Sequence, residues 1–142
     1  MIRLTKIFHF EMAHAIHGYD GACKHIHGHS YALEVSVCSA RHFENYIPAP
    51  GFVIDFKEIK KLVNTCIIEL FDHKMVLSAH FLTEHPSLST QENLVTWEVE
   101  PTAENLLMYI QKTLSYHLPE NIQLTHLKLY ETKDSYAEWL KE

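Results

Sequence analysis

Residues 27–38 alternate between two kinds of side chain, and this alternation constrains the fold more than any other feature of the chain. One set of positions is mostly aromatic or apolar and consists of His27, His29, Tyr31, Leu33, Val35 and Val37. The other set is mostly small or polar and consists of Gly28, Ser30, Ala32, Glu34, Ser36 and Cys38. Because successive side chains of a β-strand point to opposite faces, the pattern predicts a long strand with one more apolar face. Both histidines lie at the start of that face.

The segment 2–11 also alternates between apolar and polar residues and predicts a second strand. Residues 15–26 carry glycines in a turn-forming context and predict the loop between the two strands. Two strands joined by such a loop are expected to pair antiparallel. This pairing would bring His14, at the end of one strand, beside His27 and His29 at the start of the next.

The rest of the chain predicts two helices and two more strands. The expected elements are a helix from 55 to about 72, a helix over 102–118, a strand over 122–131 and a strand over 135–140. Asp55 and Thr102 are the expected N-caps of the helices. The segment 74–100 is a long connection, with a short extended piece at 94–99. The strand order ββααββ predicts an α+β fold, with helices on one face of an antiparallel sheet.

Both faces of the expected strand 122–131 carry apolar residues. A strand of this kind is expected to be buried on both sides or to lie at a subunit contact.

Size and charge narrow the class of protein. A chain of 142 residues fits one domain, 1–142, and the net charge of −6 argues against binding to nucleic acid or to an anionic membrane. No apolar run approaches the length of a membrane span. The N-terminus lacks the apolar core of a signal peptide, so a cytoplasmic location is expected. The 3 cysteines are an odd number, which argues against a disulfide framework.

His14, His27 and His29 are the candidate metal ligands. Two histidines spaced two apart on a strand point to the same face and can share one ion. Three imidazoles leave a fourth position open, which is typical of a catalytic rather than a structural zinc site. His25 and His17 are rival ligands, and the alternative is that the histidines are merely hydrogen-bonded strand residues.

Three further side chains could serve a reaction near such a metal. Cys23 could be a fourth ligand, a nucleophile or a general acid or base. Asp72 could hold the His73 imidazole if the helix has ended there; otherwise His73 only favours the negative end of the helix dipole. The carboxylate of Glu131 could accept two parallel hydrogen bonds from a pterin or guanine edge, or it is an exposed strand-end residue.

Taken together, these motifs resemble the 6-pyruvoyl-tetrahydropterin synthase superfamily, over nearly the whole chain and in the same order. The matching motifs are Cys23-x-x-x-His27-Gly28-His29, His14 upstream, Asp72-His73, Pro101-Thr102-Ala103-Glu104-Asn105 and Tyr130-Glu131-Thr132. The three-residue gap after Cys23 and the tail 131–139 are similar to the 6-carboxy-5,6,7,8-tetrahydropterin synthase branch of queuosine and deazapurine biosynthesis.

The resemblance implies a tunnelling fold, with a four-stranded antiparallel sheet backed by two helices and assembled into a homohexamer with sites between subunits. The implied reaction is conversion of 7,8-dihydroneopterin triphosphate to 6-carboxytetrahydropterin, acetaldehyde and triphosphate. It implies about one zinc ion per chain. The implied roles are zinc ligation by His14, His27 and His29; acid–base catalysis by Cys23 with Asp72 and His73; and pterin binding by Glu131 with Thr102 in the same pocket.

Other functions remain open from the residues alone. One is 6-pyruvoyl-tetrahydropterin synthase activity, which eliminates triphosphate without carbon–carbon cleavage. Another is a non-catalytic zinc-binding protein with Cys23 as fourth ligand, and a third is a cysteine hydrolase using Cys23 and His73. The segment 74–100 departs from the family pattern, so substrate contacts there cannot be transferred. Lys24 or Lys74, or a neighbouring subunit, would supply the positive potential for a triphosphate.

Overall fold

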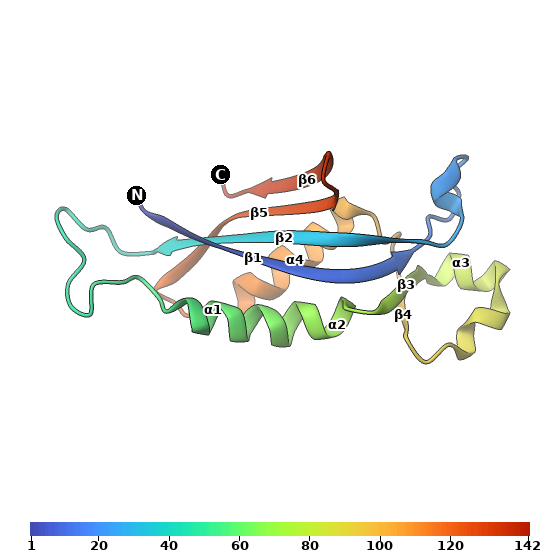
Figure 1. The fold of residues 1–142 in the computed structure, drawn as a ribbon, viewed down its shortest axis with the longest axis horizontal. Helices are drawn as coiled ribbons and strands as arrows, with labels where there is room; N and C mark the ends of the chain where they lie inside the picture. Colours follow the sequence, from blue (N-terminus) through green and yellow to red (C-terminus); the bar gives the residue numbers. More distant parts are fainter.

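Two long antiparallel strands form the centre of the fold in the computed structural model, which describes residues 1–142 (Figure 1). They are β1 (Arg3–His14) and β2 (His27–Ser39). The register pairs His14 with His27 and Met12 with His29. Both predicted strands and their antiparallel pairing are therefore confirmed.

The sheet has six strands in the order β4-β3-β1-β2-β5-β6, not the four that were expected. On one side β5 (Ile122–Thr132) and β6 (Ser135–Leu140) continue the antiparallel pattern, as predicted. On the other side β3 (Lys74–Ser78) and β4 (Leu94–Trp97) add two parallel pairings, β1 with β3 and β3 with β4. The sheet is mixed, and the predictions of a purely antiparallel sheet and of the order ββααββ were wrong.

The error has a physical cause in the segment 74–100. Met75, Val76 and Leu77 are buried on both faces of the sheet, so β3 shows an apolar run rather than the alternation of a half-exposed strand. Between β3 and β4 the segment forms α3 (Ala79–Glu84) and a 3-10 turn (Pro86–Thr90). The segment is thus structured throughout most of its length.

Two longer helical units cover one face of the sheet, as expected (Figure 1). The first runs through α1 (Phe56–Val63), a π-helical turn (Asn64–Ile68) and α2 (Glu69–Phe71); the second is α4 (Ala103–His117). Both predicted N-caps are confirmed, because Asp55 accepts a hydrogen bond from Lys57 N–H at 2.8 Å and Thr102 accepts one from Asn105 N–H at 3.3 Å. None of the helices is both long and apolar enough to cross a membrane.

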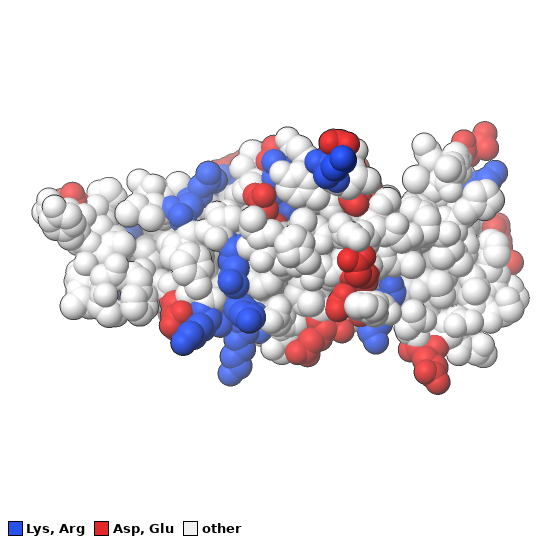
Figure 2. All heavy atoms as spheres, in the orientation of Figure 1, with Lys and Arg blue, Asp and Glu red and all other residues white.

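The main hydrophobic core lies between the helices and the inner face of the sheet. Its largest fully buried members include Phe10, Tyr31, Leu33, Phe71, Ile110, Leu127 and Leu129. On the face seen in Figure 2, basic side chains gather over α1 and acidic ones over the α2 end, so that face has no uniform charge.

A β-bulge in β5 explains why both faces of that strand looked apolar. Ser36 pairs with His126 and Val37 with Leu124, which leaves Thr125 as an extra residue. The bulge shifts the alternation by one position. Ile122 and Leu124 before it and Leu127 and Leu129 after it are therefore all buried on the inner face. The other face of β5 is only partly buried within the chain, so the strand is not buried on both sides, and the alternative of a subunit contact stays a prediction.

Candidate metal centre and active site

His14, His27 and His29 converge at one end of the inner sheet face, as the sequence predicted. Each offers one ring nitrogen, and these three atoms all lie within 4.8 Å of one another. The Nε2 atoms of His14 and His27 are 3.0 Å apart. Two ligands of a tetrahedral zinc ion with bonds of 2.0–2.1 Å are separated by about 3.3 Å. The cluster therefore has the dimensions of a metal centre.

The other ring nitrogens are held by backbone carbonyls, which fixes the tautomers. His14 Nδ1 lies 2.6 Å from the carbonyl of Pro101, and His27 Nδ1 lies 2.8 Å from the carbonyl of His25. Since a carbonyl only accepts, each Nδ1 carries the proton and each Nε2 presents a lone pair. Two lone pairs 3.0 Å apart repel one another unless a cation lies between them. This donor set fits the metal that the resemblance implies.

Burial keeps two of these rings neutral. The His14 side chain is 3% exposed, and its desolvation lowers its pKa. Desolvation likewise lowers the pKa of His29. A neutral imidazole is the form that binds a metal, so the lowered pKa values favour ligation near neutral pH.

The rival ligands are occupied elsewhere. His25 contributes its carbonyl to the orientation of His27 rather than its ring to the cluster. His17 lies 3.6 Å from the Glu84 carboxylate and stacks on the ring of His80. Neither ring belongs to the group of three.

A hollow of about 220 Å³ opens beside His14 and is lined by three more of the predicted site residues. Its lining includes Cys23, Thr102 and Glu131. The exposed Cys23 lies in a 3-10 turn (Ala22–Lys24), and its carbonyl accepts a hydrogen bond from Ile16 N–H at 2.9 Å. That bond ties the turn to the end of β1. The thiol is thereby brought to the metal centre without joining the group of ligand atoms.

Glu131 faces inward rather than lying exposed at a strand end. Its Oε1 atom is 3.9 Å from His14 Nε2 and accepts a hydrogen bond from the Tyr31 hydroxyl at 3.5 Å. Burial, reinforced by the Glu131 carboxylate, raises the pKa of Tyr31 above its usual range, so this hydroxyl keeps its proton. The carboxylate can accept hydrogen bonds from a molecule in the pocket.

The sequence pattern placed Tyr31 only on the more apolar face of its strand and gave it no role in the site. Its position two residues after His29 on the same strand face was the available signal. That position places it on the inner face beside the histidine cluster, with ring centroids 5.5 Å from His29 and 6.2 Å from His14.

Asp72 and His73 form a pair, but on the other side of the sheet. The helix ends at Phe71, and Asp72 Oδ1 lies 3.0 Å from His73 Nδ1. A hydrogen bond from Glu11 N–H, 2.9 Å long, is the main cause that lowers the pKa of Asp72. The pair thus has the geometry needed for a carboxylate to orient an imidazole.

The hollow next to this pair, about 370 Å³, is lined by His73 and by residues 11–13 and 28–30 of the two central strands, and the side chains of Glu11 and Ser30 lie on its side of the sheet. These two residues alternate with the metal-centre histidines and so point to the opposite face. The structure of one chain therefore does not bring Asp72 and His73 to Cys23.

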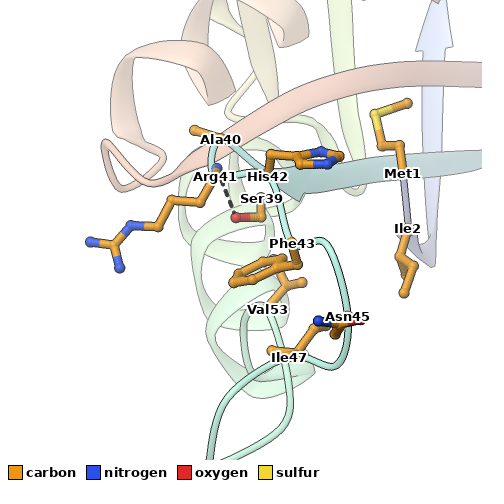
Figure 3. A pocket seen from close by; sticks show the side chains of 10 residues that line it. All are labelled: Met1, Ile2, Ser39, Ala40, Arg41, His42, Phe43, Asn45, Ile47 and Val53. Atoms are coloured by element: carbon orange, nitrogen blue, oxygen red, sulfur yellow. Dashed lines mark hydrogen bonds between the residues drawn. The ribbon is translucent and has the colours of Figure 1, made fainter.

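Another hollow, of about 280 Å³, lies at the far end of the sheet (Figure 3). Figure 3 shows Phe43, Ile47 and Val53 beside one another there, with Arg41 pointing away. It begins at Met1 and Ile2, at the other end of β1 from His14, which an extended chain places about 40 Å away. The group of three histidines that could hold a metal lies at the opposite end of the sheet from this hollow.

The chain is similar to several known proteins in sequence and in fold. A family model described as 6-pyruvoyl tetrahydropterin synthase matches residues 3–142. A 6-carboxy-5,6,7,8-tetrahydropterin synthase of Rickettsia felis is 30% identical over 97% of this chain and 99% of its own length. A dihydroneopterin monophosphate aldolase of Pyrococcus furiosus is 30% identical over 86% of this chain and 82% of its own. The solved 6-pyruvoyl tetrahydropterin synthase of Caenorhabditis elegans superposes with a TM-score of 0.71 at 20% identity, covering 99% of this chain and 96% of that one.

Proposed function

The chain belongs to the 6-pyruvoyl tetrahydropterin synthase family, a family of enzymes, and from this premise we propose that it is a zinc-dependent 6-carboxytetrahydropterin synthase. The proposed reaction converts 7,8-dihydroneopterin triphosphate to 6-carboxy-5,6,7,8-tetrahydropterin, acetaldehyde and triphosphate. It would serve queuosine and deazapurine biosynthesis in the cytoplasm. The observation that carries the proposal is the open three-histidine centre sharing one pocket with Cys23 and Glu131.

His14, His27 and His29 would hold one zinc ion, which when bound supplies a Lewis acid for the hydroxyl groups of the substrate side chain. Cys23, at the exposed rim of the pocket, accepts a proton from the substrate and returns it. Glu131 accepts two hydrogen bonds from the ring N–H and amino group of the pterin. Tyr31 donates to Glu131 and fixes its orientation.

The Asp72–His73 pair is proposed to act in the site of a neighbouring subunit. Two observations support an assembly. The pair lies across the sheet from the thiol of its own chain, and β1 and β6 each leave a strand edge free to pair with another copy. β1 pairs with β3 only at residues 12–14, and the outer edge of β6 has no partner within the chain. A ring of subunits closed through such edges agrees with the homohexamer that the resemblance implies.

The decisive experiment is incubation of zinc-loaded protein with 7,8-dihydroneopterin triphosphate, followed by mass analysis of every product. The proposal predicts the carboxylated pterin together with acetaldehyde and triphosphate. Loss of triphosphate without carbon–carbon cleavage would instead assign the 6-pyruvoyl-type reaction. Side-chain cleavage with the phosphate ester retained would favour an aldolase, the activity named for the Pyrococcus relative. Absence of any conversion would overturn the proposal.

The variant Cys23→Ala distinguishes a catalytic role of the thiol from a role as metal ligand. Because the thiol lies outside the group of ligand atoms, the variant should keep its metal content while losing nearly all turnover. A sharp loss of metal would favour a closed structural site with Cys23 as fourth ligand. Thiol-dependent hydrolysis that persists without metal would favour a cysteine hydrolase.

A further inference from the structure

His73 adopts a backbone conformation that ordinary residues avoid. Its φ of 59° lies in the left-handed region, and it is the one residue other than glycine with a positive φ. A side chain with a Cβ atom is disfavoured there, although histidine is among the residues found in it more often. Such a conformation persists only where the surrounding contacts impose it, and it is often retained at functional sites.

Two hydrogen bonds with Glu11 of β1 hold the N-terminal side of His73. His73 N–H donates to the carbonyl of Glu11 at 2.7 Å. Glu11 N–H in turn donates to Asp72 Oδ1 at 2.9 Å. One strand residue therefore holds both members of the pair, on the N-terminal side of His73.

Asn93 holds the C-terminal side. Its side-chain Nδ2 donates to the carbonyl of His73 at 3.2 Å, and its own carbonyl accepts from Met75 N–H at 2.9 Å. Asn93 directly precedes β4, so the segment between the two added parallel strands is what brings it to His73. Asn93 also lines the same hollow as His73.

We propose that Asn93 is a positioning residue, which clamps the left-handed backbone of His73 and thereby keeps its imidazole against Asp72. The direction of the Cβ atom of His73 follows from its backbone angles. A return to negative φ would swing the ring away from the carboxylate that now lies 3.0 Å from Nδ1. This inference rests on the proposed role of His73 in proton transfer and extends it to the segment 74–100.

The test compares Asn93→Asp, which keeps the size but removes the amide donor, with Asn93→Ala and with the control Glu92→Gln at the exposed neighbour. We expect both Asn93 variants to lower kcat about tenfold with little change in KM and no change in zinc content, since substrate binding at Glu131 and metal binding are untouched. The control should behave as wild type.

A second readout does not depend on turnover. The backbone carbon chemical shifts of His73, measured by NMR on the assembled protein, should move out of the left-handed range in both Asn93 variants and stay there in Glu92→Gln. Two variants are used so that poor folding of one, seen by circular dichroism, leaves the other to decide.

The outcomes separate this inference from the proposed function. If His73→Ala is inactive while both Asn93 variants keep wild-type turnover and shifts, the clamp is overturned and the proposed function stands. If His73→Ala is fully active, the proposed role of His73 fails, and the chemical shifts alone decide whether Asn93 holds the backbone. Loss of turnover with unchanged His73 shifts would also overturn the clamp, because Asn93 would then act in another way.

Discussion

The Nε2 atoms of His14 and His27 lie 3.0 Å apart while the Nδ1 atom of each ring is held by a backbone carbonyl. The carbonyl that holds His14 belongs to Pro101, just before α4, so the centre joins the end of β1 to the start of a helix. Neither ring can turn away or exchange its tautomer without breaking one of these bonds. The ligand set is therefore preorganised by the fold.

Removal of a histidine ligand should remove the metal without unfolding the chain. We expect about one zinc ion per wild-type chain and loss of most of it in His27→Ala and in His29→Ala, because two imidazoles form an incomplete site. Metal analysis after dialysis, together with circular dichroism, measures both quantities. His25→Ala is the matched control and should retain zinc, since only its carbonyl is used. Full retention of zinc in either ligand variant would refute the assignment.

Asp72→Asn should affect turnover rather than affinity. The carboxylate touches His73 and not the pocket of Glu131, so the variant should lower kcat at least about tenfold with little change in KM. Steady-state kinetics on zinc-loaded protein measure the two parameters. An unchanged kcat would mean that Asp72 only ends the helix and accepts the hydrogen bond from Glu11.

Glu131→Gln tests how the pterin is recognised. The amide keeps the size of the side chain but offers one donor and one acceptor, so one of the two pterin donors would face another donor. We expect pterin binding at least about tenfold weaker, or about 1.4 kcal/mol, with zinc and assembly retained. Calorimetry with a pterin measures the affinity, and Glu104→Gln in the same pocket lining serves as a comparison. Wild-type affinity in Glu131→Gln would refute the proposal that Glu131 binds the pterin.

Acidification should destabilise the metal-free protein. Burial lowers the pKa of His14 and His29 in the folded chain, whereas unfolded histidine titrates near about 6.5. Between those values the unfolded chain binds more protons than the folded chain. The contribution is therefore fully present above about pH 6.5 and is lost as the pH falls through the folded values.

Urea unfolding of chelator-treated protein at several pH values between about 7.5 and 5.5 measures this loss. His14→Gln removes the more buried of the two titrating groups and should show a smaller decline below about pH 6.5. Equal declines in the variant and the wild type would show that other groups control the acid sensitivity.

Local patterns in the sequence determined the central part of this protein. The alternation over residues 27–38 set which side chains of β2 face the core, and the side-chain oxygens of Asp55 and Thr102 set the starts of two helices. These features depend on neighbours a few residues away, so they can be read directly. The convergence of His14 with His27 followed from the same reasoning, because antiparallel pairing of adjacent strands needs only a short loop.

Contacts between distant segments decided the remaining features of the sheet and of the site. The apolar run of β3 is compatible with several structures until β1 pairs with it in parallel, and the bulge at Thr125 appears only when β5 is placed beside β2. Nothing local indicated that the Tyr31 hydroxyl reaches Glu131, or that Asp72 and His73 lie across the sheet from Cys23. Strand order, register and the face to which a side chain points depend on which surfaces pack together, and packing is settled only in the folded chain.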